Sequence, residues 1–168
     1  TGTAPFPVTG GGTPAVTHHE DWRGTLATNL DMPFYLSRAA LPHLVESKGS
    51  IVNIACASGL RAGRRSVAYA TSKAALIMLT KAMARDHARD GVRINAVCPG
   101  SVDTPMLAAD AEQSGEPLDG FLERLADASP NGSIASPEDV AALVRFLAGE
   151  SAAHVTGAVI PVDGGFCT

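Results

Sequence analysis

Three short apolar runs, rich in β-branched residues and separated by segments of helix length, limit the fold more than any other feature. They are IVNIA at 51–55, VRINAV at 92–97 and the run from 155 to 162. Short runs of this kind are typical of strands buried on both faces. Because helix-like segments connect them, each connection crosses one face of a sheet and the strands run parallel. The pattern predicts an α/β domain.

The segments around these strands predict helices. Thr17 and Glu20 have the spacing of a capping box, and apolar residues at helical intervals follow them. Pro33 and Pro42 interrupt this first helix and predict a kink. Good helix formers extend from 66 to 89 and predict a second long helix.

The stretch 103–135 mixes acidic, glycine, serine and proline residues. It predicts one helix, near 117–126, within the most mobile segment of the chain, which is a candidate flap. A helix at 136–149 follows, with a serine N-cap, a proline at its first position and a glycine stop.

Composition favours one soluble domain over 1–168. The chain has 45% hydrophobic and 18% charged residues and a formal net charge of -4, which predicts no nucleic-acid partner and no membrane surface. The arginines at 61–65 fit a solvated loop. Three cysteines without paired spacing favour a reducing compartment, and the absence of a signal pattern or a long apolar run makes the cytoplasm the expected location.

A glycine run, VTGGGTPAV at 8–16, is similar to a phosphate-binding loop. Such a loop follows a buried strand and enters a helix, with glycines at set positions. Little apolar sequence precedes this run, and Pro14 occupies the place of a further glycine. The sequence therefore favours a linker over 1–16, with a phosphate loop as the alternative.

Tyr69 and Lys73 carry the clearest chemical signal. Residues four apart share one face of a helix, so a lysine cation lies beside a phenol. A nearby cation lowers the pKa of a tyrosine toward the range where it exchanges protons at neutral pH. A surface pair on an amphipathic helix is the alternative. His18 and His19 suggest a metal, but adjacent helical residues do not share a face, so solvent exposure is favoured and no metal is expected.

The Tyr69 and Lys73 pattern belongs to a series of five segments. In chain order they are ATNL, IVNIACASG, YATSK, VRINAVCPGSVDTPM and VTGAVIPVDGGF. Together they resemble the short-chain dehydrogenase/reductase family, including its 3-oxoacyl-acyl-carrier-protein reductase-like members. The resemblance implies a Rossmann-like, doubly wound parallel sheet of which this chain holds the C-terminal two-thirds. It also implies NAD or NADP as cofactor, a small alcohol or carbonyl substrate, and a homo-oligomer, either a dimer or a tetramer.

The resemblance also assigns roles. Tyr69 becomes the general acid/base, Lys73 lowers its pKa and holds the nicotinamide ribose, and Asn29 supports a water beside the lysine. These residues are expected to converge on one cleft, together with the serine equivalent.

The turn after the second strand also matches the family, at Pro99, Gly100, Val102 and Thr104. By resemblance it packs on the nicotinamide. A strand exit without a ligand is the alternative, because proline and glycine serve that purpose as well. The resemblance also implies that the mobile segment 103–135 forms a lid over the substrate, in which Met106 and Leu107 either close over that substrate or pack against the core.

The serine position departs from the family pattern. A gap-free match places Cys56 where the family has its catalytic serine, and Ser58 lies two residues further on. A thiol is a weak hydrogen-bond donor, so Cys56 is expected to be an imperfect substitute, with Ser58 as the alternative. A reactive cysteine nucleophile is a further alternative.

The family's adenosine-binding half, which precedes these motifs, is expected to lie outside the given residues. Without it, one edge of the first strand at 51–55 is unpaired, which predicts that the 168 residues alone are not a stable monomer. A non-catalytic relative that keeps the fold for assembly or binding is the competing hypothesis.

Overall fold

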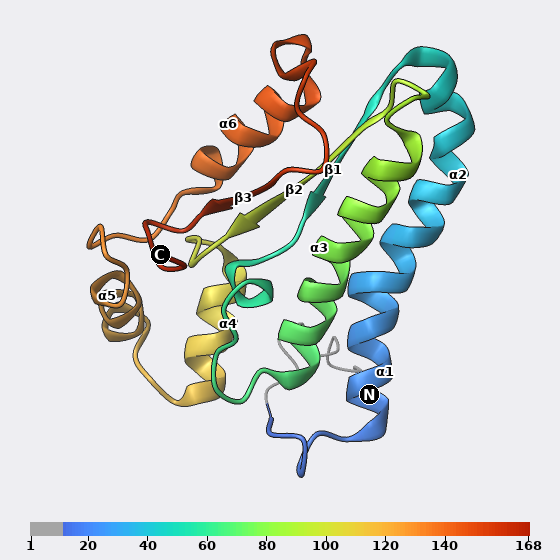
Figure 1. The fold of residues 1–168 in the computed structure, drawn as a ribbon. Coiled ribbons are helices and arrows are strands. Elements are labelled where there is room, and N and C mark those ends of the chain that lie inside the picture. Colours follow the sequence, from blue (N-terminus) through green and yellow to red (C-terminus); the bar gives the residue numbers. More distant parts are fainter. Residues whose placement is uncertain (1–11) are drawn as a thin grey trace.

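The architecture is a three-stranded parallel sheet with helices on both faces (Figure 1). The computed structural model describes residues 12–168. The strands are β1 (Ser50–Ile54), β2 (Arg93–Pro99) and β3 (Val159–Val162), in the order β1-β2-β3. The predicted α/β class and parallel strands are confirmed. Most of the predicted linker lies outside the described residues.

Two helical layers enclose the sheet. The long helix α3 (Val67–His87) packs on β2, with α2 (Met32–Ser47) beside it, and α6 (Pro137–Ala148) covers the opposite face (Figure 1). Leu76 and Ile77 of α3 are buried on the first face, and Leu147 of α6 is buried on the second. The doubly wound prediction is therefore confirmed for this part of the sheet.

The first predicted helix is divided by an irregular turn. Helix α1 (His19–Leu26) continues into a π-helical turn, η1 (Ala27–Asp31), and then into α2. Pro33 has no N–H to donate to the carbonyl of Asn29, which accounts for the irregular turn at this place. The helix continues through Pro42.

The capping box predicted at Thr17 is wrong. His18 holds the N-cap position and its side chain makes no capping hydrogen bond. The Thr17 hydroxyl instead donates to the carbonyl of Thr13 at 2.9 Å, because residues 13–17 form a turn of their own. The helix begins at His19 without that cap.

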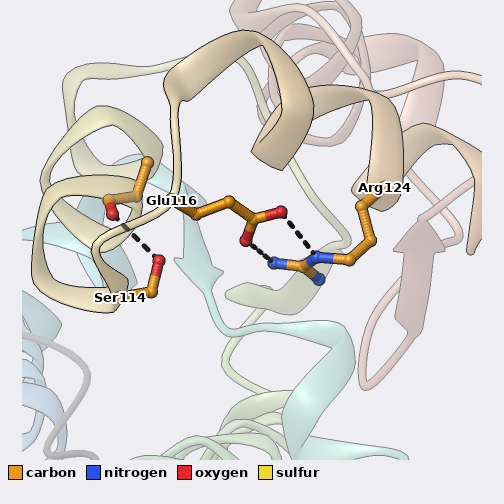
Figure 2. Close-up of polar contacts among 4 residues, drawn as sticks. Ser114, Glu116 and Arg124 are labelled. Atoms are coloured by element: carbon orange, nitrogen blue, oxygen red, sulfur yellow. Dashed lines mark hydrogen bonds and ion pairs between the residues drawn. The ribbon is translucent and has the colours of Figure 1, made fainter.

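The segment at 103–135 contains two helices, α4 (Pro105–Ser114) and α5 (Leu118–Asp127), where one was predicted. The missed helix α4 had sequence signals at both ends, since Pro105 occupies its first turn and Gly115 ends it with a φ of 70°. Figure 2 shows the connection after α4, where Arg124 donates two hydrogen bonds to the Glu116 carboxylate, at 2.8 and 3.1 Å. This pair ties the connection to α5.

The helix at 136–149 has the predicted ends. The Ser136 hydroxyl accepts from the Asp139 N–H at 3.2 Å, and the Asp139 carboxylate accepts from the Ser136 N–H at 2.8 Å. Gly149 holds the C-cap position. Two short 3₁₀ turns complete the chain, η2 (Ala57–Gly59) and η3 (Glu150–Ala152).

Two strand predictions need correction. The third strand begins at Val159 and not at 155, because the Asn95 side chain bonds the carbonyl of Val155 and the N–H of Ala158 in place of a ladder. The first strand is not buried on both faces, since Ile54 is 44% exposed. Among the described residues, no strand pairs with the outer edge of β1.

Candidate active site

A cleft of about 720 Å³ opens at the carboxyl ends of the strands. In parallel α/β sheets this edge is where ligands bind. Four of the residues predicted from the sequence line it: Cys56, Ser58, Tyr69 and Gly100. They come from η2, the first turns of α3 and the end of β2, so the fold brings together segments that are far apart in the chain.

Cys56 is positioned by the loop that leaves β1. It holds the N-cap position of η2, where its sulfur accepts a hydrogen bond from the Ser58 N–H at 3.4 Å. Gly59 follows, and a Cβ there would lie 2.8 Å from the carbonyl carbon of Lys73. Only glycine lets this loop pack directly on the α3 backbone, which places Cys56 beside the start of α3.

Tyr69 is half-buried in the first turns of α3. Burial raises the pKa of its phenol well above the ordinary value, and the Cys56 thiol and the Asp110 carboxylate raise it further. The sequence had predicted that Lys73 would lower this pKa. In this structure burial has the largest effect, and it raises the pKa of the phenol.

Lys73 lies to one side of the main cleft. Its Nζ donates to the carbonyl of Ile54 at 3.0 Å and lies 5.7 Å from the centre of the Tyr69 ring. Burial lowers the pKa of the ammonium, while Cys56 and Cys98 oppose that shift. Lys73 lines a second hollow of about 350 Å³ on the open side of β1.

Asn29 lines this second hollow too, from the π-helical turn. Its side-chain amide donates to the Ser72 hydroxyl at 3.1 Å, and that hydroxyl donates to the carbonyl of Tyr69 at 2.7 Å. Asn29 and Ser72 are both buried. This chain of bonds holds the turn of α3 that carries Tyr69. Ser72 was not predicted from the sequence as a site residue, although it lies three residues after the tyrosine.

The predicted turn after β2 lies partly at the cleft and partly against the segment that follows α5. Pro99 is buried at the end of the strand, and Gly100 faces the cleft. Val102 pairs with Ala135 in an isolated bridge, and the Thr104 hydroxyl donates to the carbonyl of Val102 at 3.2 Å. These contacts fix the turn against the segment that follows α5.

The outer wall of the cleft comes from α4 and α5. Met106, Leu107 and Asp110 line it from α4, and Phe121 and Leu125 line it from α5. Each helix presents residues four apart, which share a face. Met106 and Leu107 had been considered as lid residues. The other three residues were not predicted from the sequence, because α4 was not predicted and no inward face was assigned to α5.

The described residues hold no group of three His, Cys, Asp or Glu side chains placed to bind a metal ion. Within the same residues, no helix is both long and apolar enough to cross a membrane.

Comparison with known proteins agrees with this geometry. Residues 2–167 match the family described as enoyl-(acyl carrier protein) reductase. The chain belongs to the short-chain dehydrogenase/reductase family. It is 45% identical over 149 residues to a meso-2,3-butanediol dehydrogenase of Serratia marcescens, which covers 89% of this chain and 57% of the relative. It is 36% identical over 147 residues to a 3-oxoacyl-acyl-carrier-protein reductase of Thermotoga maritima, which covers 87% and 57% respectively.

Solved structures of this family have the same fold. The aldohexose dehydrogenase of Thermoplasma acidophilum superposes with a TM-score of 0.87 at 35% identity, covering 93% of this chain and 63% of that one. An actinorhodin polyketide ketoreductase with NADPH gives a TM-score of 0.89 at 33% identity, covering 95% and 64%. The chain therefore spans less than two thirds of the length of these relatives.

Proposed function

We propose that this protein is an NAD(P)-dependent oxidoreductase that interconverts an alcohol and a carbonyl by hydride transfer, with Tyr69 as general acid/base. The observation that carries the proposal is the position of Tyr69, half-buried at the cleft beside the Cys56 thiol. A phenol that keeps its proton can donate it to a carbonyl oxygen as that oxygen gains charge. In the reverse direction the phenolate accepts a proton from the alcohol.

The residues present fit a nicotinamide cofactor. The Lys73 ammonium has three N–H donors and gives one to the carbonyl of Ile54, which leaves donors for the hydroxyls of a ribose. Gly100 offers backbone without a side chain at the mouth of the cleft. When bound, the cofactor supplies or accepts the hydride. The proposal includes both NAD and NADP, and the solved relatives include structures with NADP or NADPH bound.

The neighbours of Tyr69 have supporting roles in this proposal. Cys56 polarises the substrate carbonyl in place of the family's serine, with Ser58 as the second candidate for that role. Asn29 acts as a positioning residue, because its bond to Ser72 holds the turn that carries the phenol. Pro99, Gly100, Val102 and Thr104 form the turn that packs on the nicotinamide.

A non-catalytic relative is the second candidate function. The observation that favours it is the thiol at the serine position, because a thiol polarises a carbonyl less than a hydroxyl does. Such a protein keeps the fold for assembly. Assembly as a homo-oligomer is part of both proposals, and the exposed apolar residues Met32, Phe34 and Leu36 on α2 offer a surface for it.

Nucleotide binding and turnover test the proposal separately. Thermal unfolding of the protein is measured with NAD, NADH, NADP and NADPH, because a ligand that binds only the folded state raises the unfolding temperature. Turnover is measured with a set of small aldehydes and ketones. Tyr69→Phe is expected to abolish turnover and keep the nucleotide-dependent shift.

Tyr35→Phe is the matched control, since Tyr35 is 61% exposed and is the only other tyrosine of the chain. It is expected to leave turnover unchanged. Equal turnover in wild type and Tyr69→Phe would overturn the proposed role of Tyr69. A nucleotide shift without turnover of any carbonyl would favour the non-catalytic relative.

A further inference from the structure

The C-terminal turn, residues 163–168, lies at the carboxyl edge of the sheet, where β3 ends (Figure 1). The Asp163 carboxylate accepts from the N–H groups of Gly165 and Cys167, at 3.0 and 2.9 Å, and the Asp163 carbonyl accepts from the N–H of Phe166 at 3.1 Å. These bonds fold the turn back on itself. The fold of the turn brings Phe166 to the lining of the cleft.

The segment after α5 holds one side of this turn. The N–H of Asn131 donates to the carbonyl of Gly164 at 3.1 Å, and the Ser129 hydroxyl donates to the carbonyl of Asp163 at 3.4 Å. Ser129 and Asn131 line the cleft themselves. The two bonds therefore join the turn to the wall that α4 and α5 form.

Arg61, in the loop that follows β1, holds the other side of the turn. Its Nη1 donates to the carbonyl of Phe166 at 2.7 Å, and its guanidinium carbon lies 5.1 Å from the centre of the Phe166 ring. The Cys167 thiol also contacts this loop, at 3.7 Å from the carbonyl of Ala57. A thiol is a weak donor and a guanidinium is a charged one, so Arg61 is the stronger attachment.

The Phe166 ring stands between Arg61 and the cleft. Phe166 lines the cleft, whereas Arg61 is exposed and does not line it. A cation that stacks on an aromatic ring occupies one face of the ring, which leaves the other face for the cleft. Arg61 therefore acts on a ligand in the cleft through the position of Phe166.

The backbone that carries Arg61 is fixed in its turn. The N–H groups of Leu60 and Arg61 both donate to the carbonyl of Ala57, at 2.9 Å each. The same loop carries Cys56, at the N-cap position of η2. The Arg61 contact thus fixes the Phe166 ring relative to the group that polarises the carbonyl in the proposed mechanism.

We propose that Arg61 is a positioning residue, which selects the carbonyl substrate by fixing the Phe166 ring as an apolar wall of the cleft. A carbonyl compound with a flat apolar group packs on this wall, inside the cleft that Tyr69 also lines. A ring that moves freely has to be ordered when the substrate binds, which weakens binding. This inference rests on the proposed function, since it assigns a specificity residue to the same site.

Two methyl ketones that differ by a phenyl group test the inference. Acetone has no group that needs the wall, and 4-phenyl-2-butanone carries a ring on a flexible arm. The full chain is assayed with each ketone and the reduced nicotinamide cofactor. Arg61→Met removes the cation and its donors but keeps a long side chain. We expect it to raise KM for 4-phenyl-2-butanone by about 10-fold, the effect of one hydrogen bond to a charged group.

The change is expected in KM and not in kcat, because packing on the wall is the same in the ground state and the transition state. Both constants for acetone are expected to stay unchanged. Arg64→Met is the matched control, since Arg64 is exposed in the same loop and does not line the cleft. It is expected to leave both ketones unaffected. Cooperative unfolding of each variant shows that it is folded.

Two further variants separate this role from general support of the loop. Arg61→Lys keeps a cation that can donate to the carbonyl of Phe166, so it is expected to recover part of the KM for 4-phenyl-2-butanone. Phe166→Leu removes the ring. In that background Arg61→Met is expected to have no further effect on KM, because the ring that Arg61 positions is gone.

Hydrogen exchange of the amides at 164–168, followed by mass spectrometry, measures the attachment of the turn without turnover. Arg61→Met is expected to speed this exchange by about 10-fold, and Arg64→Met is expected to leave it unchanged. Unchanged exchange in Arg61→Met overturns the inference. An unchanged KM for 4-phenyl-2-butanone, an equal rise for acetone, or turnover of acetone alone by the wild type also overturns it.

Failure of the proposed function has a different signature, which is no turnover of either ketone with any nicotinamide cofactor. In that case, binding of 4-phenyl-2-butanone by ligand-observed NMR still decides the role of Arg61. Binding that Arg61→Met weakens and Arg64→Met does not supports the inference. Equal binding by wild type and Arg61→Met, or no binding by the wild type, overturns it.

Discussion

Replacing Cys56 with serine is expected to raise the rate of carbonyl reduction. The sulfur of Cys56 lies at the cleft beside Tyr69 and is held by the Ser58 N–H at 3.4 Å. A serine hydroxyl in this position keeps the backbone bond and donates a stronger hydrogen bond to the carbonyl oxygen as charge develops there.

The size of the effect follows from what one such donor contributes. Removing a preorganised donor from an oxyanion site costs about 100- to 1000-fold in kcat. The thiol retains part of that stabilisation, so Cys56→Ser is expected to raise kcat by about 10- to 100-fold. This range corresponds to about 1.4–2.7 kcal/mol of transition-state stabilisation. The change is expected in kcat more than in KM, because the developing charge exists only in the transition state.

The assay follows oxidation of the reduced nicotinamide cofactor at saturating carbonyl substrate. Cys167→Ser is the matched control, because the Cys167 sulfur contacts the carbonyl of Ala57 at 3.7 Å and does not line the cleft. It is expected to leave kcat unchanged. If Cys56→Ser has no effect while Ser58→Ala lowers kcat, the carbonyl-polarising role belongs to Ser58 and the reasoning about Cys56 is refuted.

Three further predictions concern the loop, the sheet and the proton. Gly59→Ala brings a Cβ within 2.8 Å of the α3 backbone. It is expected to lower the free energy of unfolding by about 1–3 kcal/mol, measured by chemical denaturation, and to lower kcat. In Gly63→Ala the new Cβ lies 3.7 Å from its nearest neighbour, so this control is expected to change neither quantity. Equal effects of the two would contradict the close packing. Asn95→Leu leaves the partly buried carbonyl of Val155 and N–H of Ala158 without their side-chain partner, and is expected to cost about 1–3 kcal/mol in the same measurement. A loss well below about 1 kcal/mol would show that water replaces the amide. Asp110→Asn removes a charge that raises the Tyr69 pKa, so the pH profile of alcohol oxidation, which needs the phenolate, is expected to shift toward lower pH; no shift would place that charge out of reach.

Local patterns predicted most of the secondary structure. The cap at Ser136 and the helix from Val67 were predictable because their signals lie within one turn of the residues concerned. The helix at 105–114 was not predicted although Pro105 and Gly115 mark its ends, because the acidic and small residues between them are also typical of a loop. The cap predicted at Thr17 was wrong, because a threonine hydroxyl can also donate to a backbone carbonyl of its own turn, here that of Thr13.

The sequence by itself determined the order of elements, the parallel sheet and the pairing of Tyr69 with Lys73 on one helix, because periodicity and spacing are properties of the chain alone. The tertiary structure decided what each of these residues faces. It places Tyr69 at the main cleft and Lys73 at a neighbouring hollow, and it sets the Tyr69 pKa by burial and by Asp110, forty-one positions later in the chain. Desolvation and charge depend on distances in space, which sequence separation does not encode.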